Sequence, residues 1–212
     1  MPRAGDRPLQ PGPDERRRRL VRRFADTVEP LLAAGRSYPE LSVRELITEA
    51  GISRSTFYAY FADKTALLDA MTDDVSREVF EAAETWFALD RPTRRADFDR
   101  ALEPLFASYV EHQELFRAIA DAAAQSPAAR RNLERIVGRA ADQLTQHIAA
   151  QQARGHAAPG DPRTTAAWLA WMVERGLHQL VPGADEEEIA ALHRSLSDVA
   201  WRALYAGTDA AG

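Results

Sequence analysis

The chain has 212 residues, of which 45% are hydrophobic, and its formal net charge is −5. This length suits one or two domains with a proper core. The absence of cysteine excludes disulfides and thiolate metal sites. No apolar run is long enough to span a membrane, and the first residues do not form the apolar core of a signal peptide. We therefore expect a cytoplasmic protein without a membrane partner.

The chain begins with a segment rich in proline and glycine, residues 1–13, which we predict to be a disordered arm. A helix is expected to follow from about Asp14 to Ala34, with Gly35 ending it. Pro30 removes one helical hydrogen bond and should bend this helix.

The segment from Ser42 to Lys64 reads as a helix, a glycine turn and a second helix. Ser42 can cap the first helix, and Glu45 completes a capping box. After the turn at Gly51, Ser53 can cap the second helix. Two phenylalanines four residues apart would face inward and leave serine, threonine, tyrosine and arginine outside. Such a helix-turn-helix can place its second helix in the major groove of DNA.

The run GISRSTFYAYFADKTALL resembles the signature of the TetR family of bacterial transcriptional regulators. The resemblance covers roughly residues 15–70, and the remainder matches only in length and helical character. It implies a homodimer on a palindromic double-stranded DNA operator. The first residues of the second helix would approach bases, and Tyr58, Tyr60 and Lys64 the DNA backbone. Tyr58 could instead pack against the first helix.

The predicted DNA-binding residues are Ser42, Arg44, Ser53, Arg54, Ser55, Thr56, Tyr58, Tyr60 and Lys64. The charge distribution agrees with this assignment. Residues 1–64 contain 12 basic and 9 acidic residues, whereas residues 65–212 contain 15 and 23. Positive potential is therefore concentrated at the proposed DNA-reading end.

Helical periodicity continues beyond Lys64. A long helix should reach about Leu89, and a second should contain Pro104. Further helices are predicted over residues 113–124, 126–154, 162–181 and 185–206. The expected fold is all-α with about nine helices. A three-helix DNA-binding domain would occupy residues 14–64, and a ligand-binding and dimerisation bundle residues 65–212.

The C-terminal bundle carries more large apolar side chains than a small bundle needs. The resemblance to the TetR family implies that these side chains surround a cavity for a small apolar effector. An ordinary bundle core is the alternative. The run WMVERGL also resembles the ligand helix of the mycobacterial ethionamide-resistance regulators, a TetR subgroup. The candidate ligand-binding residues are Trp86, Phe98, Leu102, Leu105, Tyr109, Phe116, Trp168, Met172, Glu174 and Arg175.

The last two predicted helices carry apolar stripes that could form a four-helix bundle about a twofold axis. Packing of this face within its own subunit is the alternative. The predicted dimer residues are Trp171, Gly176, Leu177, Leu180, Ile189, Leu192, Leu196 and Val199.

Catalysis is not expected, because the five histidines are scattered and no nucleophile stands beside a base. We also expect no metal and no cofactor. The sequence therefore predicts a ligand-responsive transcriptional regulator, most simply a repressor. A constitutive DNA-binding dimer without effector and a transcriptional activator remain open alternatives.

Overall fold

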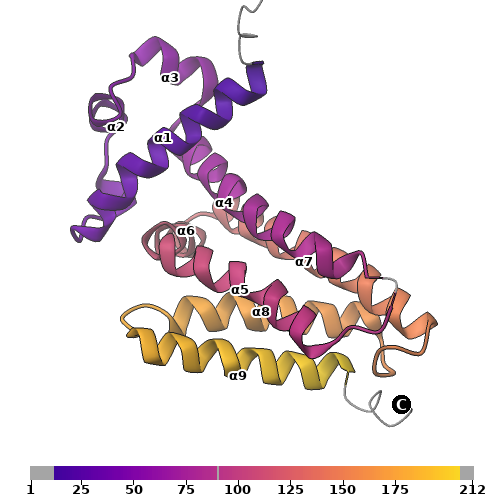
Figure 1. The fold of residues 1–212 in the computed structure, drawn as a ribbon. Coiled ribbons are helices and arrows are strands. Elements are labelled where there is room, and N and C mark those ends of the chain that lie inside the picture. The colour runs from indigo at the N-terminus through magenta and orange to yellow at the C-terminus, as the bar shows by residue number, and fades with distance from the viewer. Residues whose placement is uncertain (1–11, 90, 206–212) are drawn as a thin grey trace, which may run out of the picture.

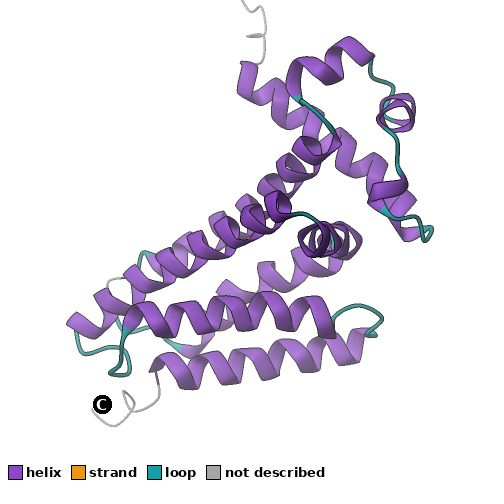
Figure 2. Cartoon of the chain, turned by 180° about the vertical axis from the view of Figure 1, so that it is seen from behind, coloured by secondary structure: helices purple, strands orange, loops and turns teal. Residues whose placement is uncertain are grey.

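The computed structural model describes residues 12–89 and 91–205. Within these ranges the chain forms nine α-helices and one short 3-10 helix, and contains no strand (Figure 2). The elements are α1 (Pro13–Ala33), η1 (Tyr38–Glu40), α2 (Val43–Glu49), α3 (Arg54–Tyr60), α4 (Lys64–Phe87), α5 (Arg95–Glu111), α6 (Gln113–Gln125), α7 (Pro127–Ala153), α8 (Pro162–Leu180) and α9 (Glu186–Tyr205). The predicted all-α fold is confirmed.

The predicted helix ends agree with the structure to within about two residues. Helix α1 begins at Pro13, continues through Pro30, and is followed by Gly35 at a φ of 87°. The short 3-10 helix η1 was not predicted. Residues 1–11 of the predicted arm lie outside the described residues.

Helices α1 to α3 lie together at one end of the molecule, and α4 runs from them into the C-terminal helices (Figure 1). Helices α8 and α9 lie side by side along the edge farthest from α1 to α3. Helix α6 sits between α1 and the bundle, and its residues pack against both α1 and α7.

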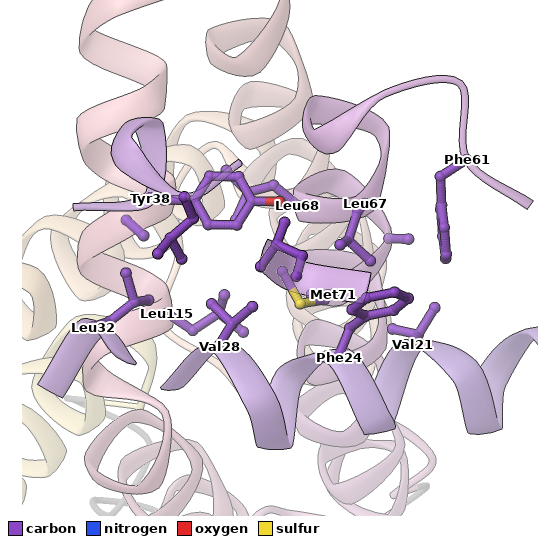
Figure 3. Packing of buried hydrophobic residues seen from close by; sticks show 14 of the residues in the cluster. Val21, Phe24, Val28, Leu32, Tyr38, Phe61, Leu67, Leu68, Met71 and Leu115 are labelled. Carbon is purple, nitrogen blue, oxygen red and sulfur yellow. The ribbon is translucent and has the colours of Figure 1, made fainter. Parts of the chain in front are cut away.

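The core at the helix-turn-helix end is built from α1, α2, α3, α4, α6 and the 3-10 turn (Figure 3). Phe24 and Val28 of α1 are fully buried against Leu67 and Met71 of α4. Leu115 of α6 is fully buried in the same cluster. The first turns of α4 and α6 therefore belong to the hydrophobic core that holds the helix-turn-helix.

A second core fills the opposite end of the bundle. Trp86 of α4 lies 5.2 Å from Phe98 of α5 between ring centroids, in an edge-to-face arrangement. Leu204 and Tyr205 of α9 are buried beside them. The space between the two cores is the cavity described below.

Candidate DNA-binding surface and ligand cavity

The helix-turn-helix is held by the local contacts that its sequence predicts. Ser42 caps α2, and its hydroxyl accepts a hydrogen bond from the backbone N–H of Glu45 at 3.2 Å. Ser53 caps α3 by accepting the N–H of Thr56 at 3.1 Å. Gly51 has a φ of 60°, a left-handed conformation that a side chain would strain. These three features define where α2 starts, where it stops and where α3 starts.

Helix α3 is anchored by aromatic packing on its inner face. Phe57 and Phe61 are buried, and their ring centroids lie 5.8 and 5.9 Å from that of Phe24 on α1. Both contacts are edge-to-face, the arrangement that aromatic quadrupoles favour. The anchoring fixes which face of α3 remains exposed.

The exposed face of α3 carries the predicted base-reading side chains. All four are exposed: Ser53, Arg54, Ser55 and Thr56. The hydroxyls of Ser53, Ser55 and Thr56 form a small network at the start of the helix. The Ser53 hydroxyl lies 2.9 Å from that of Ser55 and 2.7 Å from that of Thr56. The Arg54 guanidinium lies over the Tyr58 ring at 5.5 Å from its centroid.

The remaining predicted DNA contacts fall into two groups. Arg44 is exposed, and Tyr58 is 48% exposed, so it does not pack inward against α1. Ser42 is exposed but serves as a helix cap, and Tyr60 is half-buried against the core. All four lie on or beside α2 and α3, so they can share one surface with the start of α3.

Lys64 occupies a different environment from the one expected. Its ammonium donates hydrogen bonds to the carbonyls of Pro39 and Leu41, at 2.5 and 3.1 Å. The backbone carbonyl of Lys64 accepts a hydrogen bond from the buried Tyr38 hydroxyl at 2.6 Å. Lys64 therefore fastens η1 and the residues before α2 to the start of α4. These bonds occupy two of the three ammonium donors, and the predicted contact of the third with the DNA backbone stays a prediction.

An apolar cavity of about 220 Å³ lies inside the C-terminal helices. Its walls come from α4 to α9, and nearly all of its lining is hydrocarbon. Thr72, Ser76, Tyr109 and Glu174 are the polar residues among the described lining residues, and Glu174 is the only charged one. The lining includes the predicted residues Trp86, Phe98, Leu102, Leu105, Tyr109, Phe116 and Glu174.

Three predicted ligand-binding residues do not line this cavity, so their assignment is corrected. Trp168 is 74% exposed and Met172 is 37% exposed. The side chain of Arg175 is 56% exposed. Helix α8 instead turns Leu169, Val173 and Leu177 toward the cavity, as the spacing of i, i+4 and i+8 requires.

Glu174 is the most unusual group in the cavity wall. Its Oε2 atom is buried and has no hydrogen-bond partner among the described residues. The Arg175 Nε atom is 3.7 Å away, which is beyond hydrogen-bonding distance. Burial raises the pKa of the Glu174 carboxyl, and the charges of Arg175 and His178 oppose that rise. Burial also raises the pKa of the nearby Tyr109 phenol, with a further contribution from Glu174.

The other end of the cavity is closed by a buried polar chain around Tyr205. The Trp86 indole N–H donates to the Tyr205 hydroxyl at 3.1 Å, and His147 Nε2 lies 2.9 Å from the same oxygen. Nδ1 of His147 lies 3.4 Å from the Phe87 carbonyl. Because a carbonyl can only accept, Nδ1 carries the proton and Nε2 accepts from Tyr205. Burial lowers the pKa of His147, which favours this neutral form.

Two helices connect the cavity to the core that holds the helix-turn-helix. Helix α6 buries Leu115 in that core and turns Phe116 into the cavity wall, while Ile119 belongs to both. At the junction of α5 and α6, Nδ1 of His112 lies 2.6 Å from Glu29 of α1. The hydrogen bond that Glu29 accepts from His112 raises the pKa of His112. Helix α4 makes the second connection, because its first turns lie in the core and its later turns line the cavity.

The predicted dimer surface on α8 and α9 divides into two sets. Trp171, Leu180 and Val199 are 38%, 57% and 48% exposed. Ile189, Leu192, Leu196 and Gly176 are partly buried. The assignment of Leu177 to the dimer surface is corrected, since this residue is 4% exposed and lines the cavity. Trp168 and Met172 join the exposed set, which gives α8 an apolar outer face.

The described residues contain no cluster of three or more histidines and carboxylates that could hold a metal ion. In the same part of the chain, no helix combines the length and the hydropathy that a membrane crossing requires.

Comparison with known proteins identifies both parts of this architecture. Residues 32–71 match the model of bacterial regulatory proteins of the tetR family. Residues 98–206, about half of the chain, match the model of the C-terminal domain of the transcriptional regulator EthR. The chain belongs to the TetR family. TetR-family proteins of this kind are regulators and not enzymes, as the sequence predicted.

Relatives and solved structures agree with this membership. The chain is 32% identical over 127 residues to the HTH-type transcriptional regulator EthR of Mycolicibacterium smegmatis, covering 58% of this chain and 54% of that protein. It is 32% identical over 115 residues to EthR of Mycobacterium tuberculosis, covering 54% and 51%. The chain thus spans about half the length of the curated relatives it matches. A TetR-family regulator from Syntrophomonas wolfei shares the fold with a TM-score of 0.70 at 17% identity, covering 89% of this chain and 96% of that one.

Proposed function

We propose that this TetR-family protein represses transcription by binding a palindromic operator as a homodimer, and that a small apolar effector releases it. The observation that carries the proposal is the exposed polar face of α3. Its inner face is anchored by Phe57 and Phe61, and its outer face presents Arg54, Ser55 and Thr56 together. Arginine can bridge guanine O6 and N7, and the threonine methyl can meet a thymine methyl.

The proposed dimer uses the outer face of α8 and α9. An isolated soluble subunit rarely exposes several large apolar side chains on one face. Trp168, Trp171, Met172, Leu180 and Val199 are all exposed in this subunit. Two copies of the face related by a twofold axis would bury these side chains against each other. Each dimer would then offer two copies of α3 to half-sites about one helical turn, roughly 34–36 Å, apart.

The proposed effector occupies the cavity between α4 and α8. Apolar walls with a few polar groups are typical of small-molecule sites. The effector acts only if it binds the released conformation more tightly than the DNA-bound one. The cavity is directly connected to the DNA-binding helices, because α4 and α6 contribute both to the cavity wall and to the core that holds α3. A small displacement of either helix would change the separation of the two α3 helices.

The test begins with the DNA flanking the gene of this protein, in which an inverted repeat is expected. The full-length protein should bind that duplex in fluorescence anisotropy, and binding should weaken steeply with salt. Apolar molecules that raise the thermal unfolding midpoint should lower operator affinity. Leu102→Trp, which fills the cavity, should retain operator binding and lose the response to those molecules.

Three results would contradict the proposal. Operator affinity that stays unchanged while a molecule demonstrably fills the cavity would refute release by an effector and favour a constitutive DNA-binding dimer. Sedimentation showing a monomer at the concentrations where the operator is bound would refute the dimer. Increased transcription from the operator in a reporter strain would identify an activator.

A further inference from the structure

We propose that the cavity selects an amphipathic cation: an effector with an apolar body and one protonated amine, held by the Glu174 carboxylate. The inference rests on the proposed effector site and specifies its chemistry. It starts from the composition of the wall, in which Glu174 is the only charged group among the described lining residues.

The surroundings of Glu174 give its buried carboxylate oxygen no hydrogen-bond donor among the described residues. A buried carboxylate is costly unless it is paired and hydrogen-bonded. Oε2 of Glu174 has no hydrogen-bond partner among the described residues, and the Arg175 guanidinium stays 3.7 Å away with more than half of its side chain in solvent. Hydrogen bonds to charged groups contribute more than neutral ones. An ammonium group in the cavity would supply the donor that Oε2 lacks and a closer counter-charge than the solvent-exposed Arg175.

Two aromatic rings beside Glu174 favour the same head group. Tyr109 and Phe116 both line the cavity, and their rings stack in parallel with centroids 4.4 Å apart. The π-face of an aromatic ring attracts a cation at separations up to about 6 Å. A ligand carboxylate would instead meet the like charge of Glu174. The geometry therefore favours an amine and disfavours a fatty acid.

The rest of the cavity suits the apolar body. From Glu174 the wall continues through Leu102 and Leu105 to Trp86 and Phe98, without another charged residue among those described. The head group would lie beside Phe116 of α6, which is one of the two helices that reach the DNA-reading core. An amine bound there would contact the element whose displacement the proposed mechanism requires.

The experiment compares three ligands of matched chain length and different charge: decylamine as its ammonium salt, decanol and decanoate. Binding to the full-length protein is measured by calorimetry at neutral pH, below the concentrations at which these ligands form micelles. Decylammonium should bind at least about tenfold more tightly than decanol, and decanoate should bind most weakly.

Glu174→Gln keeps the size of the side chain and removes its charge. It should lower decylammonium affinity to the level of decanol and leave decanol affinity unchanged. Glu187→Gln, which removes an exposed carboxylate at the start of α9, should change none of the three. Circular dichroism and the thermal unfolding midpoint establish that both variants are folded. The comparison of the three ligands on the wild-type protein does not depend on either variant.

The outcomes separate this inference from the proposed function. Equal or tighter binding of decanol to the wild type, or an amine preference that survives Glu174→Gln, overturns the cation assignment. A preference that survives the substitution would reflect attraction to the acidic surface. If decanol binds as tightly as decylammonium and lowers operator affinity, the cation assignment is refuted and the proposed effector site stands. If none of the three ligands binds, the cation assignment is overturned, whereas the proposed function is decided by the operator-affinity and sedimentation measurements described above.

Discussion

Arg54→Ala tests the side chain that we propose reads a base. Arg54 lies in the first turn of α3, is exposed, and makes no ion pair with any described residue. Its recorded contact is with the Tyr58 ring, 5.5 Å from the centroid. An exposed cation–π contact contributes about 0.5–1 kcal/mol, so the variant should fold with nearly unchanged stability.

The expected loss of DNA affinity is larger than the loss of stability. One bidentate arginine–guanine pair contributes about 1–3 kcal/mol of discrimination. A symmetric dimer would make this contact twice, so operator binding should weaken by about 2–6 kcal/mol, which is at least about thirtyfold. Binding to an unrelated duplex of the same length should change little, because nonspecific binding depends on phosphate contacts.

The assay is fluorescence anisotropy with the operator and with the unrelated duplex at several salt concentrations. Arg202→Ala on α9 is the matched control, since it removes an exposed arginine far from α3. Operator affinity within a factor of about two of the wild type would refute base contact by Arg54. An equal loss on both duplexes with a shallower salt dependence would place Arg54 on phosphate and refute base readout.

Three further predictions concern the framework. Lys64→Ala removes hydrogen bonds to the Pro39 and Leu41 carbonyls, so the free energy of unfolding in urea should fall by about 1–3 kcal/mol; an unchanged midpoint would contradict this bridging role. Phe57→Ala should cost about 3–5 kcal/mol in the same assay and abolish operator binding, because Phe57 is fully buried beneath α3. Burial lowers the pKa of His147 in the folded protein, so as the pH falls this histidine takes up a proton in the unfolded chain before it does so in the folded one. The free energy of unfolding should therefore fall as the pH drops below about 6.5. His147→Gln should flatten that part of the pH profile, and equal slopes for variant and wild type would exclude His147 as its source.

Local signals explain why the helix-turn-helix could be predicted well. The caps at Ser42 and Ser53 and the left-handed Gly51 act over three or four residues, and each is found where the sequence places it. Lys64 shows the limit of such reasoning. Its partners Pro39 and Leu41 are backbone carbonyls more than twenty residues away, brought close by the 3-10 helix η1. Neither the 3-10 helix nor a carbonyl acceptor leaves a pattern in the side-chain sequence.

Helix α8 shows why the cavity could be predicted only in part. Its sequence carries two apolar stripes, one through Leu169, Val173 and Leu177 and another through Trp168 and Met172. Helical periodicity separates the stripes and does not say which one faces inward. The larger side chains suggested the cavity, whereas the structure turns the smaller aliphatic ones inward and leaves both larger ones exposed.

The two faces of α8 also constrain how an effector could act. In the proposed dimer the outer face is held by the partner subunit, so α8 would resist outward movement when the cavity fills. The opposite walls are less constrained, since Val79 and Phe80 of α4 and Phe116 of α6 lie on helices that face α8 across the cavity. Strain introduced by an effector would therefore be relieved on that side. Because the first turns of α4 and α6 are buried in the core beneath α3, the side that would move in the proposed mechanism is the side that carries α3.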